Sequence, residues 1–100
     1  MSSPVIRIIL NPDKTTSFSP SPQKAPVSDL VFWRNETQES HWPWPTDSNY
    51  NPDATGWSIP AVPPSETSGD FATPTSAQTV YYCCKLHPHR TSERGIIKVG

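Results

Sequence analysis

Prolines recur along the whole chain, and they constrain its fold more than any other feature. Thirteen of them are spread over 100 residues, from Pro4 to Pro88. Because proline lacks a backbone donor and disrupts both helices and central strands, this distribution leaves no uninterrupted helical stretch. Only 33% of the residues are hydrophobic, which suits one modest core between two layers. The sequence therefore predicts a single all-β, loop-rich domain over residues 1–100.

Strand-like runs lie at both ends of the chain. Four are rich in β-branched or aromatic residues: VIRIIL (5–10), DLVFW (29–33), QTVYYCC (78–84) and GIIKV (95–99). The proline-rich run 17–28 suits only the edge of a sheet. Between about residues 42 and 70 lies an irregular excursion, too long for an ordinary loop, which we expect Trp57 and Tyr50 to anchor in the core. The pattern favours an antiparallel sandwich or barrel.

Charge and hydropathy argue against nucleic-acid binding and against a membrane-spanning segment. The formal net charge is −1 and no basic stripe occurs, so nucleic-acid binding is not expected. The longest apolar run, residues 5–10, is too short to span a membrane or to serve as a signal-peptide core, and it contains Arg7. We therefore expect either a cytoplasmic protein or a chain that starts after a removed leader. The sequence contains no G-x-S-x-G elbow, the motif that would indicate a serine hydrolase.

Two adjacent cysteines precede two histidines in YYCCKLHPHR, residues 81–90. Neighbouring residues of a strand point to opposite faces, so a disulfide between Cys83 and Cys84 would be a poor staple. Cys84 and His87 instead form Cys-x-x-His, which lets a strand end and the following loop offer a thiolate and an imidazole to one metal ion. His41, after another predicted strand, is the candidate third ligand. The alternative is two buried thiols without a metal.

Six motifs in order resemble those of the cupredoxins, the small blue-copper proteins such as amicyanin and plastocyanin. In chain order they are FSP at 18–20, SDLVFWRN at 28–35 with Ser28 in place of glycine, W-x-N-x5-H from Trp33 to His41, SGDF at 68–71, TVYYCCKLHPH at 79–89 with Val80 in place of tyrosine, and GIIKV at 95–99. The resemblance covers most of the chain. It implies a Greek-key β-sandwich with His41 and the 84–89 loop at the same end.

The resemblance also implies that His41, Cys84 and His87 hold copper. One thiolate and two neutral imidazoles in a trigonal plane suit an ion that changes between Cu(I) and Cu(II). Zinc with water as a fourth ligand would fit the same residues. Since Cys84 occupies the inward face of its strand, Cys83 is expected to be a non-ligating thiol at the surface or at a sheet edge, and the alternative is a second metal ligand.

The usual axial methionine of these proteins is missing. The spacing of the family motif places Arg90 or Ser92 there, and Met1 is the only methionine. A guanidinium that stays protonated cannot donate to a cation.

Three substitutes remain open. The first is a site without a fourth side chain, with a backbone carbonyl near Ser40; the others are the imidazole of His89 and the carboxylate of Glu93. The first is favoured, because Pro88 stiffens the backbone between the two histidines.

As to function, the resemblance implies a single-electron carrier rather than an enzyme, with a redox partner protein. Trp42 and Trp44 in HWPWP either cap the hydrophobic end of the sandwich or form an apolar docking patch for that partner. The alternatives are a copper-delivery module and a structural or interaction subunit on the same fold. The resemblance suggests an extracytoplasmic location, in the periplasm or at the cell surface.

Overall fold

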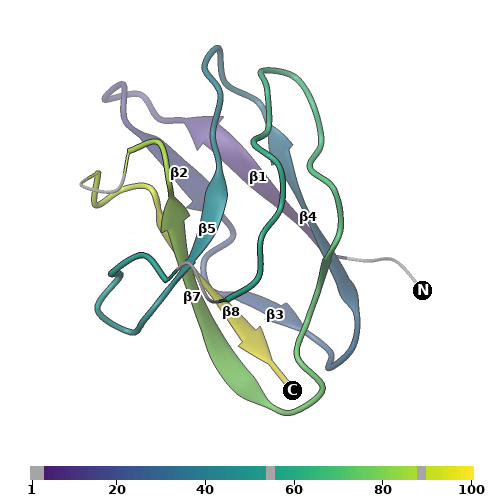
Figure 1. Ribbon diagram of the computed structural model, residues 1–100. Coiled ribbons are helices and arrows are strands. Elements are labelled where there is room, and N and C mark those ends of the chain that lie inside the picture. Colours follow the sequence, from purple (N-terminus) through teal and green to yellow (C-terminus); the bar gives the residue numbers. More distant parts are fainter. Residues whose placement is uncertain (1–3, 54–55, 88–89) are drawn as a thin grey trace.

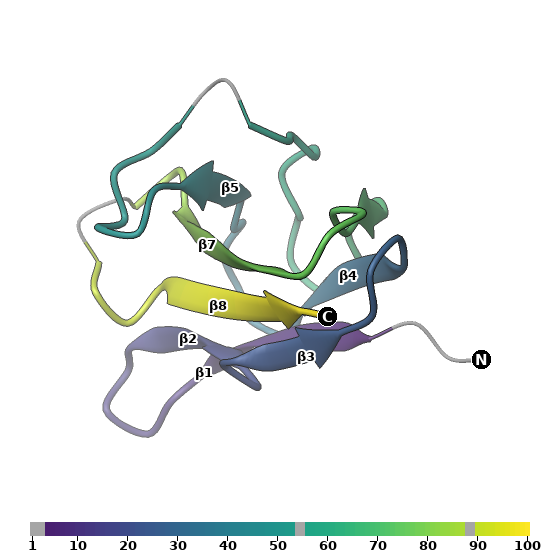
Figure 2. The same cartoon turned by 90° about the horizontal axis from the view of Figure 1, so that it is seen from below.

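Two four-stranded sheets pack face to face (Figures 1 and 2). The computed structural model describes residues 4–53, 56–87 and 90–100. Its strands are β1 (Val5–Leu10), β2 (Thr16–Ser19), β3 (Gln23–Ala25), β4 (Leu30–Asn35), β5 (Pro43–Thr46), β6 (Phe71–Ala72), β7 (Gln78–Cys84) and β8 (Arg94–Val99). The sheet orders are β2-β1-β4-β6 and β3-β8-β7-β5. The expected all-β sandwich is therefore confirmed. A search of these same ranges finds no helix with the length and apolar character of a membrane span.

The proline-rich segment crosses from one sheet to the other. It forms β2 at the edge of the first sheet and β3 at the edge of the second, which confirms its expected edge position. The sheets are mixed, since β1 runs parallel to β4 and β3 runs parallel to β8. The antiparallel pairing that the sequence favoured does not hold at these two pairs, because the crossings between sheets bring together strands that are not consecutive in the sequence.

Alternate residues of the central strands build the core. Trp33 on β4 is fully buried, stacks on Trp57 at a ring-centroid distance of 5.7 Å, and stands edge-on to Tyr82 of β7 at 5.3 Å. Trp57 therefore anchors the excursion in the core as expected. Tyr50 does not: its ring packs edge-on against Tyr81, whose side chain points to the opposite face of β7 from Tyr82.

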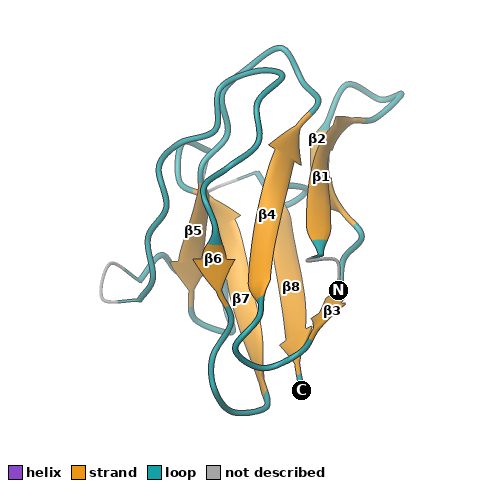
Figure 3. Cartoon of the chain, turned by 90° about the vertical axis from the view of Figure 1, so that its right-hand side faces the viewer, coloured by secondary structure: helices purple, strands orange, loops and turns teal. Residues whose placement is uncertain are grey.

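The excursion contains one strand that the sequence did not indicate. In β5, Pro43 and Pro45 alternate along the edge of the second sheet, next to β7. An edge position tolerates alternate prolines because the side away from the sheet needs no ladder donors. On that outer side, the carbonyl of Pro45 accepts a hydrogen bond from the backbone N–H of Asp53 at 2.9 Å. Most of the chain between β5 and β6 is loop (Figure 3).

Gly95 on β8 lies opposite Tyr82 on β7, and the tyrosine ring occupies the space that a side chain would need. A Cβ atom at Gly95 would lie 2.2 Å from Cζ of Tyr82, which is fully buried. We expect Gly95→Ala to lower the free energy of unfolding by about 1–3 kcal/mol, measured by urea denaturation. Gly69→Ala is the control, since its Cβ would meet only Pro60 at 4.0 Å. Equal losses in the two variants would contradict this packing argument.

Candidate metal centre

The loop after β4 carries His41 to one end of the sandwich. Asn35 fixes this loop: its side-chain amide donates to the carbonyls of Glu39 at 2.8 Å and Val62 at 3.0 Å, and its oxygen accepts from the backbone N–H of Thr37 at 2.9 Å. His41 and Val62 exchange both backbone hydrogen bonds, at 3.1 and 2.7 Å. The imidazole of His41 is fully buried as a result.

Cys84 is the last residue of β7, and His87 lies in the turn that follows. A backbone hydrogen bond between these two residues closes the turn. The N–H of His87 donates to the carbonyl of Cys84 at 3.1 Å. The Sγ atom of Cys84 lies 3.7 Å from Nδ1 of His41 and 3.6 Å from Nδ1 of His87. Two atoms bound to one ion at about 2.0–2.3 Å, with an angle of about 120° between the bonds, are about 3.7 Å apart. The structure therefore brings together the three residues predicted from the sequence, with both sulfur–nitrogen distances short enough for one shared ion.

The carboxylate of Glu93 joins these three side chains. It is buried, with Oε1 3.0 Å from Nδ1 of His87 and 3.4 Å from Nδ1 of His41. One donor atom from each of the four residues lies within 4.8 Å of those of the others. Of the two side chains considered as substitutes for methionine, the structure thus brings Glu93 to the cluster, and His89 lies outside the described residues.

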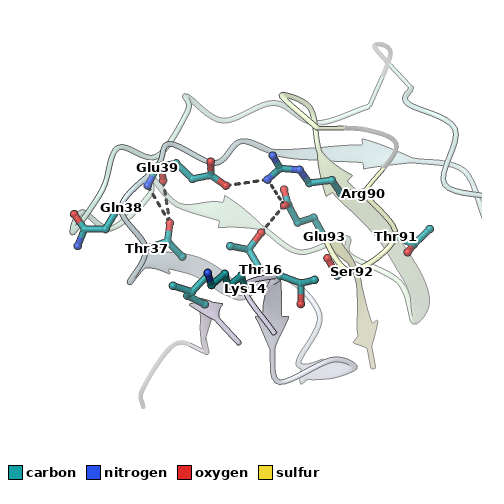
Figure 4. Close-up of a pocket in the computed structure, with 11 residues that line it drawn as sticks. Lys14, Thr16, Thr37, Gln38, Glu39, Arg90, Thr91, Ser92 and Glu93 are labelled. Atoms are coloured by element: carbon teal, nitrogen blue, oxygen red, sulfur yellow. Dashed lines mark hydrogen bonds and ion pairs between the residues drawn. The ribbon is translucent and has the colours of Figure 1, made fainter. Parts of the chain in front are cut away.

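The second oxygen of Glu93 is held from the other side (Figure 4). Its Oε2 accepts hydrogen bonds from the hydroxyl of Thr16 and from Nη1 of Arg90, the latter at 3.0 Å. Nη1 of Arg90 also donates to Oε1 of Glu39 at 2.9 Å, and that same Oε1 lies 3.7 Å from Nε2 of His41. The sequence did not single out Thr16 or Glu39, and no short motif could have done so, because the network joins three separate segments.

The metal-free cluster shifts the pKa values of His41 and Glu93 in opposite directions. Burial is the largest influence on His41 and lowers its pKa, but contacts with the Cys84 sulfur and the Glu93 carboxylate outweigh it and raise the pKa to about 9. Burial likewise raises the pKa of Glu93, but hydrogen bonds from His41, Thr16, Arg90 and His87 outweigh it and hold the pKa well below its usual range. A protonated imidazole thus faces an ionised carboxylate.

These shifts predict how the stability of the metal-free protein depends on pH. The pKa of His41 rises from 6.5 to about 9 on folding, so its contribution is complete below pH 6.5 and is lost as the pH rises through about 9. The pKa of Glu93 is lowered from 4.5, so its contribution is present above pH 4.5 and is lost as the pH falls. We expect the melting temperature to be highest between pH 4.5 and 6.5.

Calorimetry of the metal-free protein across this pH range checks the prediction. Glu93→Gln is expected to flatten both sides of the profile, because Glu93 also raises the pKa of His41. A profile that is the same in the parent and the variant would show that this pair does not determine the pH dependence.

Cys83 does not lie at the surface or at a sheet edge, as the sequence suggested. It is fully buried on β7, which has neighbours on both sides. Trp44 of β5 and Arg94 of β8 lie directly opposite it, and Arg94 in turn stacks on Tyr50 of the excursion. These side chains cover the outer face of the sheet. Burial raises the pKa of the Cys83 thiol, which favours its inert, protonated form.

Trp42 and Trp44 are half-buried and meet edge to face, with ring centroids 5.4 Å apart. The indole N–H of Trp42 donates to the carbonyl of Ile59, which ties the start of β5 to the excursion. Nζ of Lys85 lies 4.5 Å from the ring centroid of Trp42 and 3.9 Å from that of Trp44. The pair is therefore partly covered by a cation, and its role as a docking patch stays a prediction.

No protein-family model and no curated protein matches the chain. Among solved structures, a purple cupredoxin from Nitrosopumilus maritimus is similar with a TM-score of 0.80 and 20% identity, over 98% of this chain and 100% of that one. The reduced Cu(I) form of an amicyanin variant has a TM-score of 0.74 and 18% identity, over 100% of this chain and 84% of that one. A second Cu(I) amicyanin variant has a TM-score of 0.72 and 20% identity, over 98% and 82% of the two chains. At sequence identities of 18–20%, this similarity is evidence for the fold alone.

Proposed function

We propose that this chain, which has the cupredoxin fold, is a mononuclear copper protein that transfers single electrons. The observation that carries the proposal is the spacing of the Cys84 sulfur, 3.7 and 3.6 Å from Nδ1 of the two histidines. Its support from outside the chain is the similarity to a purple cupredoxin and to Cu(I) forms of amicyanin. The proposed ligands are His41, Cys84 and His87.

The donor set fits copper. A soft thiolate favours Cu(I) and two imidazoles support Cu(II), so the bound ion supplies a reversible one-electron couple. The chain's own contribution is a buried pocket: His41, Cys84 and Glu93 are each 0–1% exposed, which limits access of water. Asn35 holds the loop of His41 through the carbonyls of Glu39 and Val62, so one ligand is fixed before metal binds.

Glu93 is the proposed fourth residue that would hold the ion. Its Oε1 atom lies 3.0 Å from Nδ1 of His87 and 3.4 Å from Nδ1 of His41, so an ion bound by the two imidazoles would have this oxygen within reach. Thr16 and Arg90 hold the other oxygen of the carboxylate, so a single oxygen faces the cluster.

Electrons would leave through His87, the most accessible member of the cluster. Its side chain is 23% exposed, whereas that of His41 is fully buried. Leu86, its neighbour in the sequence, is 46% exposed and adds an apolar side chain to the surface of the same turn. A redox partner protein is therefore proposed to dock over Leu86 and His87. An extracytoplasmic location for both proteins is the expectation that accompanies this role.

The experiment that tests the proposal loads the metal-free protein with Cu(II) and with Zn(II), then measures metal content, visible absorption and voltammetry. One copper per chain, an intense thiolate band and a reversible one-electron wave are expected. Preferential retention of zinc, or copper without a thiolate band, would refute the electron-carrier proposal. Rapid loss of Cu(I) to a competing chelator would instead favour the copper-delivery alternative.

A further inference from the structure

An open pocket lies beside the metal centre, on the opposite side of the Glu93 carboxylate from the cluster. Its volume is about 820 Å³, which is in the range of small-molecule sites. The walls come from the β1–β2 turn, the 37–39 loop and the 90–93 turn. Figure 4 shows Thr16, Glu39, Arg90 and Glu93 pointing toward one another, whereas Gln38 and Thr91 point outward.

Arg90 lines this pocket, and only part of its guanidinium is bound by the residues that the structure describes. Among the residues that the structure describes, its hydrogen bonds to Glu39 and Glu93 both use Nη1. A guanidinium has five N–H donors, and its Nε and Nη2 side matches the two oxygens of a carboxylate or phosphate. Arg7 shows the contrast: its Nε and Nη2 atoms already bind both oxygens of Glu36, at 2.6 and 2.8 Å.

The two carboxylates in the pocket compete only weakly with an incoming anion. Glu93 is 1% exposed and its Oε2 is already taken by Thr16 and Arg90. Glu39 is 46% exposed and Arg90 is 49% exposed, so their ion pair is largely screened by water. The Nε and Nη2 side of Arg90 can therefore bind a ligand while Nη1 keeps its contact with Glu93 and holds the side chain in place.

We propose that this pocket binds a small oxyanion, either a carboxylate or a phosphate. Arg90 provides the paired N–H donors. Lys14, which also lines the pocket, provides a second positive charge, and Ser92 lies at the rim. The site is a property of the metal-free chain and does not depend on the proposed electron transfer.

Titration of the ¹⁵N-labelled, metal-free protein tests this proposal. Inorganic phosphate and acetate are added separately at constant ionic strength, with chloride as the reference salt, and amide shifts are followed. We expect saturable shifts at Lys14, Thr91 and Ser92 with phosphate, with acetate, or with both, and the comparison identifies the preferred anion. Arg90→Gln is expected to weaken binding about tenfold or more, because it removes charge-assisted hydrogen bonds.

Two further variants sharpen the test. Glu39→Gln should strengthen binding, since it removes the competing carboxylate from Arg90. Arg7→Gln, which breaks a surface ion pair on β1, should leave binding unchanged. Non-saturating shifts with both anions, an unchanged affinity in Arg90→Gln, or equal losses in Arg90→Gln and Arg7→Gln would overturn the proposal. Failure of the protein to load copper would overturn the proposed function and leave this result standing.

Discussion

In the copper-loaded protein, Cys84→Ser is expected to abolish the intense visible absorption, whereas Cys83→Ser should keep most of it. The thiol of Cys84 faces the core and lies within 3.7 Å of both histidine Nδ1 atoms. Cys83 is equally buried, but it lies on the other face of β7, between Trp44 and Arg94 of the neighbouring strands. A serine hydroxyl cannot replace the soft sulfur donor that gives this absorption.

The two variants control for each other because the cysteines are adjacent, fully buried and of the same size. Any general loss of stability from burying a hydroxyl should therefore appear in both, and thermal unfolding of the metal-free variants measures it. Equal loss of absorption would mean that both thiols bind the ion, or that β7 is shifted by one residue, which would turn every side chain to the opposite face.

The sequence predicted the sandwich because its strands alternate clearly. Alternation along QTVYYCC assigned Val80, Tyr82 and Cys84 to the inner face, and all three are buried there. Edge strands were predicted correctly where proline excludes a central position. The parallel pairs and β5 were missed, because pairing between strands far apart in the sequence leaves no local pattern, and because Pro43 and Pro45 are disfavoured in strands except at an edge.

The candidate site was also predictable only in part, because local motifs can be recognised in the sequence and contacts between distant segments cannot. His41, Cys84 and His87 occur in short motifs with fixed spacing, so sequence reasoning found them. The position of Cys83 was predicted wrongly, because the outer face of β7, on which it lies, is covered by residues of other segments that local alternation does not reveal.

Ser28, which stands where the family pattern has glycine, has a backbone φ of 53°, so the turn keeps the conformation that favours glycine.

Glu93→Gln is expected to change the character of the copper site rather than remove it. If the carboxylate binds the ion, it would weaken the bond between the ion and the Cys84 thiolate, and its replacement by a neutral amide should move absorption intensity toward longer wavelengths. Loss of a negative charge should also favour the reduced ion, raising the reduction potential by roughly 100 mV. Optical and electron-paramagnetic spectra, together with voltammetry, measure both effects.

Glu39→Gln is the matched control for this prediction, because it removes the same charge without touching the proposed ligand position. Glu39 is 46% exposed, and its carboxylate lies 3.7 Å from Nε2 of His41, the nitrogen remote from the cluster, and 2.9 Å from Nη1 of Arg90. Water screens it, so we expect a smaller change of potential and no movement of the thiolate band. If Glu93→Gln leaves the spectra of the copper-loaded protein unchanged, then Glu93 is not a ligand. The near-trigonal site of His41, Cys84 and His87, which the sequence favours, would then be the correct description.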